Sequence, residues 1–334
     1  MHLIVVLDPA EMAAWASGRN PQVDLWNAAL SSLQPSWCEP IEEDALHDAS
    51  EHALARLVLG RSLRADEDGQ LPLTGWRRSQ PEPWGCLTPA HGLVGSDRIT
   101  LVPPSELALD AQESRSLFEA VLPLFLSEGV ELQWHSALQW HARHDSLRRL
   151  PCASVGRVSG DSVQRWQGRT PLAAARLMRR LQNEAQMVLH GHPVNHDRHE
   201  RGLLPVNTLW LSACGQPGDL TAEPPLTDVS ERLGQTVVCS FGSMPLPPDG
   251  TRDLHAALET WLRSLPEAAA HSAAAPHLVL CSASRAQAFV PAPPATSGWA
   301  RWRRRLLGDG RLGGGRPLTL QGCLQLLQNE ETVA

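Results

Sequence analysis

The sequence has 334 residues, a formal net charge of −7 at pH 7, 42% hydrophobic residues and 19% charged residues. This length accommodates one large core or two smaller ones, and the apolar content excludes a chain that is disordered throughout. The negative net charge argues against nonspecific binding of nucleic acid over the whole surface.

Several kinds of chemistry are excluded because the residue types are missing. All 29 basic residues are arginine and there is no tyrosine, so no Schiff-base lysine, P-loop lysine or tyrosine acid is available. The seven cysteines are dispersed without a C-x-x-C pair, which fits buried or free thiols in a reducing cytosol. The start lacks a basic segment and no apolar run reaches transmembrane length. The sequence therefore favours a cytoplasmic protein with no membrane partner.

Strand and helix patterns alternate along the first third of the chain. Residues 2–7 are predicted to form a buried strand, residues 11–33 contain helical material, and residues 44–59 are predicted to form a helix. Residues 60–83 are charged and punctuated by glycine and proline, which predicts a loop or hinge.

The next segment mixes extended and helical patterns. We expect two short extended pieces at 84–102 and a helix at 106–126 entered through Ser105. The later elements, in order, are a hairpin of 130–134 with 138–142, a short strand or turn at 152–158, and a helix at 172–190.

The remaining pattern continues the alternation. Strands are predicted at 236–240 and 277–282, and helices at 251–265 and 318–327. The whole pattern predicts a layered α/β fold with a mainly parallel sheet and helices on both faces. We expect an N-terminal α/β segment at 1–60 and a main domain at 84–330, or one continuous domain that includes both.

The densest run of signals lies between residues 181 and 215. Gly191 and Pro193 end the preceding helix, Asn195 suits the N-cap of a short helix at 196–201, and Gly202 suits its C′ position. Residues 203–211 are apolar on both faces, which is typical of a central parallel strand. Ligands of open α/β sheets bind at the carboxyl end of such strands.

Four polar residues in this run suggest an anion site. Arg198 and Arg201 share a helix face, and with Asn195 and Asn207 they could bind a phosphate or a carboxylate. We expect these four side chains to converge beside the carboxyl end of the strand that follows, with an anionic small molecule as the ligand class. The alternative is a structural clamp, in which the same residues cap the helix and the arginines pair with Glu184 or Glu200.

Histidine and cysteine give weaker signals. The cluster of His190, His192, His196 and His199 contains imidazoles that metals bind, but no Asp/Glu/His motif accompanies it, so we expect neither a metal nor a cofactor. Cys214 lacks a base at a recognisable spacing, which favours a small buried residue over a nucleophile. A second histidine group, His135, His141 and His144, falls on the predicted hairpin.

One basic and aromatic run stands near the end of the chain. Arg301, Arg303, Arg304 and Arg305 alternate with Trp299 and Trp302, a composition that suits nucleic acid, acidic lipid or an acidic protein face. We favour an amphipathic helix with both tryptophans buried and the arginines in water, so a nucleic-acid partner is not expected.

The segments His192-Pro193-Val194-Asn195 and Leu204-Pro205-Val206-Asn207, with Arg198, Arg201, Gly202 and Gly215, carry a resemblance. They resemble the archaeal-type cofactor-independent phosphoglycerate mutases of the alkaline-phosphatase superfamily. They are more similar to bacterial phosphoglycerate-mutase-like proteins related to the regulatory protein of the rpf cluster. The resemblance covers about residues 84–215 and implies a reduced alkaline-phosphatase-like fold.

The sequence departs from those enzymes at the positions that would bind metal. The resemblance implies an Asp-Gly motif after the first strand and a late Asp-His pair, but Pro9 follows Asp8 and no Asp-His dipeptide occurs. A two-metal phosphoryl site needs several ligands at once. We therefore expect a non-catalytic regulatory or binding module, with an anionic small molecule and a protein as its candidate partners. The alternative is an active mutase or phosphatase whose metal site is not recognised.

Overall fold

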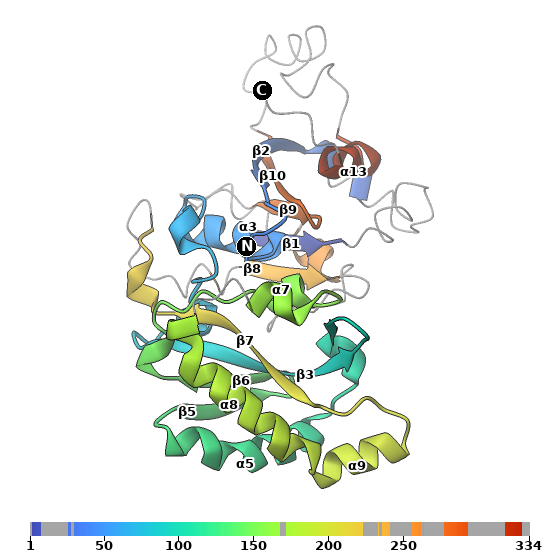
Figure 1. The fold of residues 1–334 in the computed structure, drawn as a ribbon. Coiled ribbons are helices and arrows are strands. Elements are labelled where there is room, and N and C mark those ends of the chain that lie inside the picture. The colour runs from blue at the N-terminus through green and yellow to red at the C-terminus, as the bar shows by residue number, and fades with distance from the viewer. Residues whose placement is uncertain are drawn as a thin grey trace, which may run out of the picture. The chain divides into compact units, whose positions relative to one another are not determined.

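The computed structural model has an α/β fold, as predicted, and describes ten stretches of the chain. These are residues 2–7, 26–27, 30–167, 172–222, 233, 236–240, 256–261, 263, 277–292 and 318–328. The chain divides into two compact units, each with its own sheet (Figure 1). Unit 1 comprises Met1–Glu42, Gln235–Gly242 and Asp249–Ala334, and unit 2 comprises Glu43–Gly234 and Ser243–Pro248.

Unit 1 contains a five-stranded sheet in the order β2-β10-β9-β1-β8. The predicted first strand, β1 (His2–Val6), pairs in parallel with β8 (Thr236–Ser240) and with β9 (Leu278–Cys281). The sheet continues through β10 (Arg285–Pro291), antiparallel to both β9 and β2 (Leu33–Pro40). The expected domains at 1–60 and 84–330 are each continuous in sequence. Unit 1 instead combines early and late parts of the chain, because β1 pairs with β8 and β9.

The core of unit 1 forms around β1 because all its residues are buried, as its continuous apolar run predicts. Trp26, Trp261 and Phe289 supply the large rings of this core. The predicted C-terminal helix is confirmed as α13 (Leu320–Gln328), which contributes Leu320, Cys323, Leu324 and Leu327.

Unit 2 is built on an antiparallel sheet with strand order β4-β3-β6-β5 and β7 paired to β3. The predicted hairpin is confirmed as β5 (Glu131–Ser136) and β6 (Gln139–Arg143). The two short pieces expected at 84–102 are one long strand, β3 (Trp84–Val94), and β4 (Ile99–Val102). A mainly parallel sheet is thus confirmed only in part, since the parallel pairs among the described strands are the two made by β1.

The strand at the end of the densest run is the main correction to the predicted topology. It is β7 (Thr208–Gly215), later than the expected 203–211, and it runs antiparallel to β3. Leu209 and Leu211 face a core beneath two helices, whereas Trp210 belongs to a cluster on the other face. An apolar run therefore signals burial on both faces, and it does not fix strand direction.

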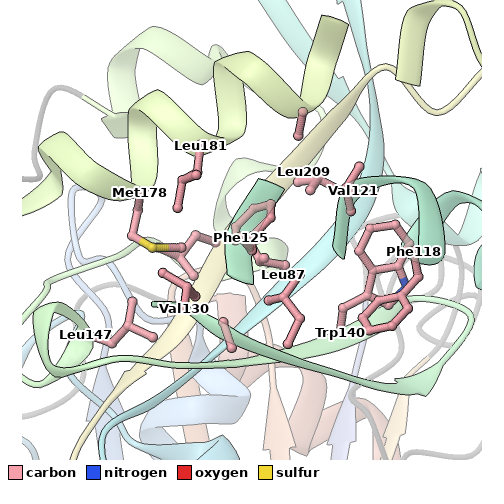
Figure 2. Packing of buried hydrophobic residues seen from close by; sticks show 14 of the residues in the cluster. Leu87, Phe118, Val121, Phe125, Val130, Trp140, Leu147, Met178, Leu181 and Leu209 are labelled. Atoms are coloured by element: carbon pink, nitrogen blue, oxygen red, sulfur yellow. The ribbon is translucent and has the colours of Figure 1, made fainter. Parts of the chain in front are cut away.

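One face of this sheet is covered by α5 (Ala111–Ser127) and α8 (Leu172–His190), the second of which has the predicted bounds (Figure 1). Figure 2 shows Leu181 of α8, Phe125 of α5 and Leu87 of β3 meeting in the shared core. α5 begins at a capping box of Asp110 and Glu113, not at Ser105, because residues from Pro104 to Leu107 form a separate 3-10 turn.

The remaining described helices of unit 2 are shorter than α5 and α8. α3 (Ala49–Leu59) is the helix predicted at 44–59, and it starts later because Asp48 caps it. The expected loop at 60–83 contains η1 (Ala65–Glu67) and α4 (Leu73–Arg78). The short elements beyond are η2 (Pro104–Leu107), η3 (Asp145–Leu147), α6 (Val155–Val158), α7 (Val163–Gln167), α9 (Pro193–Glu200) and η4 (Pro217–Asp219).

α6 occupies the place where a short strand or turn was expected. Within the described part of the chain, no helix is both long and apolar enough to cross a membrane.

Two glycines of unit 2 have similar positive φ angles but different surroundings, so they provide a test of packing. Gly69 and Gly202 have φ values of +78° and +71°. A Cβ at Gly69 would lie 2.5 Å from Leu46 Cδ1 and 3.0 Å from the amide nitrogen of Cys152, whereas one at Gly202 would meet nothing within 4 Å.

We expect Gly202→Ala to cost about 1 kcal/mol, the cost of a left-handed alanine. Gly69→Ala should cost roughly 1–3 kcal/mol more because the added methyl overpacks its surroundings. Urea unfolding of both variants measures the difference, and equal losses would contradict the packing described around Gly69.

Candidate functional site

The short helix α9 begins earlier than the sequence indicates. His192 is its N-cap, because its Nδ1 accepts the amide hydrogen of Val194 at 3.2 Å, and Pro193 occupies the first helical position. Asn195 therefore lies inside the helix and is not its cap. Proline is common at the first position of a helix, so Pro193 is a signal for the true start, whereas the sequence pattern assigned it to the end of the preceding helix. Gly202 follows the helix with a positive φ, as its predicted C′ role requires.

Asn195 connects three segments through its side chain. Its Nδ2 donates to the carbonyl oxygens of Leu189 and Val206, each at 2.7 Å, and its Oδ1 accepts the amide hydrogen of Val206 at 2.8 Å. The residue is 5% exposed. These bonds satisfy both amide atoms, so Asn195 fixes the end of α8 and the segment before β7 to α9.

Arg198 is a completely buried cation, with 0% of its surface exposed. Its Nε donates to the carbonyl oxygen of Leu204 at 3.0 Å, and its terminal nitrogens donate to the carbonyl oxygen of Leu107 and to the carboxylate of Glu113. A buried charge is tolerated when it is paired and hydrogen-bonded in this way. An external anion cannot reach this guanidinium.

Arg201 binds the other oxygen of the same Glu113 carboxylate, but its side chain is 54% exposed. The sequence pointed to Glu184 or Glu200 as partners of the two arginines, and the ion pairs instead use Glu113 of the capping box. Glu113 is distant in sequence, so no local spacing could have indicated it. Two guanidiniums therefore share the one carboxylate of Glu113.

Asn207 differs from the other three residues because its side chain bonds to a strand, β3. Its Oδ1 accepts the amide hydrogen of Gly92 at 2.7 Å, and its Nδ2 donates to the carbonyl oxygen of Gly92 at 3.0 Å. The side-chain amide of Asn207 thus bonds to Gly92 near the end of β3 in the way that the backbone of a neighbouring strand would. Nearby, the ring nitrogen Nδ1 of His91 contacts the carbonyl oxygen of Pro205 at 2.8 Å.

The four residues gather at the amino end of β7, whereas the sequence placed them at its carboxyl end. The reason is that β7 begins only at Thr208, so Val206 and Asn207 precede the strand instead of lying within it. Each of the four side chains contacts protein groups, and these contacts match the structural clamp that was the alternative interpretation.

Each histidine of the first cluster has its own environment. His192 caps α9, and burial lowers its pKa. His196 lies 3.3 Å from Glu200, while His190 and His199 are exposed. Across the described residues, no group of three or more His, Cys, Asp or Glu side chains is arranged to hold a metal ion.

The second histidine group forms a stacked pair on the hairpin. The rings of His135 and His141 are 4.7 Å apart, and Arg78 donates toward Nδ1 of His141 at 3.2 Å. Burial, followed by His135 and Arg78, lowers the pKa of His141 to about 3. His141 is therefore a neutral acceptor at physiological pH.

A buried polar network around the start of α3 was not recognised from the sequence. His47 is enclosed, with Nδ1 2.9 Å from the Glu51 carboxylate, and Nε2 accepts the amide hydrogen of Leu71 at 3.2 Å. The Asp68 carboxylate accepts the amide hydrogens of Leu46 and His47. Since both ring nitrogens of His47 are occupied, this network positions α3 and offers no free base.

Cys214 lies at the carboxyl end of β7. Burial raises the pKa of the Cys214 thiol well above its usual value, with Cys152 contributing next, so it is a poor nucleophile. Beyond it, a cavity of about 500 Å³ is lined by Pro81, Glu82, Pro83, Asp145, Arg148 and Gln216. The Arg148 guanidinium is held there by Asp219 at 2.8 Å.

Several predicted features lie outside the described residues. They are the metal-binding position at Asp8 and Pro9, and the basic and aromatic run of Trp299, Arg301, Trp302, Arg303, Arg304 and Arg305.

Comparison with known proteins gives a faint similarity. No family model and no curated protein sequence matches the chain. Among solved structures, the fold is similar to the cofactor-independent phosphoglycerate mutase from Thermoplasma acidophilum DSM 1728, with a TM-score of 0.34 and 11% identity over 88% of this chain and 90% of that chain. The PH0037 protein from Pyrococcus horikoshii gives a TM-score of 0.34 and 10% identity over 87% of each chain. Similarity at this level carries no argument about activity.

The two arginines should contribute very differently to stability. We expect Arg198→Ala to lower the free energy of unfolding by about 3–5 kcal/mol, because it breaks a buried ion pair and leaves two carbonyls unsatisfied. Arg201→Ala removes a half-exposed partner and should cost less than about 1 kcal/mol. Denaturant unfolding of both variants tests this, and a similar loss for the two would refute the clamp.

Proposed function

We propose that this protein is a non-catalytic module of the phosphoglycerate-mutase-like kind, acting through binding or regulation. The observation that carries the proposal is the full burial of Arg198, whose three donor contacts all go to protein groups. The segment that resembles the mutases is, in this chain, part of the framework. A group enclosed in this way cannot orient a phosphorylated substrate.

The sequence supports the same proposal at the positions where the resemblance implies metal ligands. Pro9 stands where the resemblance implies glycine, and no Asp-His dipeptide occurs in the chain. Phosphoryl transfer with two metals depends on all of the ligands together, so the loss of several removes the chemistry. The rival function is an active mutase or phosphatase that assembles its metal site from other residues.

Binding of an anion remains part of the proposal, restricted to one residue. Arg201 is the arginine of the clamp that solvent reaches, and it shares Glu113 with Arg198. A phosphate or carboxylate could bind the exposed side of the Arg201 guanidinium without disturbing Arg198. The proposed ligand is therefore an anionic small molecule held at the surface of α9.

The catalytic alternative is tested directly on the purified full chain. We expect fewer than two stoichiometric divalent ions by elemental analysis, and no turnover of phosphoglycerate with added manganese, because the metal ligands implied by the resemblance are absent. An unrelated active mutase assayed in parallel controls for the conditions. Robust turnover, or two tightly bound ions, would establish the rival function.

The anion contact has a separate test with inorganic phosphate and phosphoglycerate as probes. We expect either probe to raise the Tm of the wild type, and Arg201→Ala to abolish that rise by removing the reachable guanidinium. Arg180→Ala is the matched control, since Arg180 is also about half exposed and pairs with one glutamate, Glu128. No rise in the wild type, or equal loss in both variants, would refute the anion site at Arg201.

A further inference from the structure

The backbone of β7 is irregular near its carboxyl end. Ala213 has a φ of +52°, a left-handed conformation that is uncommon for a residue with a side chain, and the pairing with β3 shifts register between Trp84 and Cys86. Such a bulge costs free energy and persists where the surrounding structure requires it.

The bulge decides which way Cys214 points. Leu209 and Leu211 face the core beneath α5 and α8, so strict alternation would place Ala213 there and turn Cys214 to the opposite face. The extra residue reverses this parity, and Cys214 joins Leu209 and Leu211 in the same core. Gly85 leaves the necessary space, since a Cβ there would lie 2.8 Å from Cys214 Sγ.

Cys214 meets a second thiol in that core. The Sγ atoms of Cys152 and Cys214 are 3.7 Å apart although the residues are 62 positions apart in sequence, and both residues are buried. The backbone of Cys152 is fixed by its amide, which donates to the carbonyl oxygen of Gly69 at 2.9 Å. A disulfide requires a sulfur separation of about 2.05 Å, so the two sulfur atoms, already in contact, must move closer to bond.

A small cavity reaches one of the two cysteines. It has a volume of about 30 Å³, and Cys152, Trp166, Met178 and Trp210 are among its lining residues, whereas Cys214 is not. This space holds roughly one water molecule. Hydrogen peroxide is of comparable size, whereas a bulky disulfide reagent does not fit.

We propose that Cys152 and Cys214 form a peroxide-dependent modification site that closes into an intramolecular disulfide. Cys152 reacts first: its thiolate attacks one peroxide oxygen, the O–O bond breaks, and the leaving hydroxide takes up a proton to form water. The product is the sulfenic acid of Cys152.

The second step joins the sulfurs. The thiolate of Cys214 attacks the Cys152 sulfur, the S–O bond breaks, and a second water leaves. In total, two thiols lose two electrons and two protons, and one hydrogen peroxide becomes two waters. Burial raises the pKa of Cys214, so closure is slow at neutral pH and faster as the pH rises.

The experiment treats the folded full chain with hydrogen peroxide and maps its peptides without reduction. We expect a cross-linked peptide pair joining Cys152 to Cys214, and a higher Tm for the oxidised protein, because the bond closes a long loop of the unfolded chain. Reduction with dithiothreitol should return the original Tm.

Variants assign the order of the two steps. Cys214→Ala should leave a sulfenic acid at Cys152 that dimedone traps, whereas Cys152→Ala should leave Cys214 unmodified. Cys86→Ala is the matched control, because Cys86 is a buried thiol of the same sheet outside this core cluster, and it should retain the cross-link.

The mapping of the wild type decides the proposal even if a variant fails to fold. Free thiols at both Cys152 and Cys214 after peroxide has oxidised other residues would overturn it. Cross-links that join other cysteine pairs, or that appear only under denaturing conditions, would overturn it as well.

Discussion

The buried guanidinium of Arg198 is the constraint that joins α9 to the start of α5 and to the segment before β7 in unit 2. An arginine removed from water must direct its donors to acceptors, and here they come from the turn before α5, the first turn of α5 and the segment before β7. These pieces are held in one arrangement because any displacement leaves a buried charge unpaired. This single side chain therefore ties α5, α9 and the segment before β7 together.

The two ends of β7 are consequently different environments. At its amino end, Asn195 and Asn207 use amide groups to continue the hydrogen bonding that the sheet does not provide there. At its carboxyl end the strand bulges, which turns Cys214 into the core and next to Cys152. At the first end both side-chain amides are paired with backbone groups, whereas the second end brings together two groups that can change their covalent state.

This arrangement also separates the possible functions of the resembling segment. A residue can serve the fold and a ligand at once only if part of it remains accessible, and among the clamp's arginines only Arg201 meets that condition. The burial of Arg198 makes that arginine part of the framework of unit 2. A ligand can therefore reach the exposed side of α9 at Arg201 and cannot reach the buried Arg198.

The sequence by itself determined the elements whose signals are local. Periodicity gave the bounds of α8, alternation gave the hairpin of β5 and β6, and the apolar run gave β1. The tertiary structure alone decided the antiparallel direction of β7, because an apolar strand reports burial and carries no information about its neighbour. It likewise decided that Arg198 pairs with Glu113, a residue 85 positions away, since an ion pair formed by packing leaves no trace in local spacing.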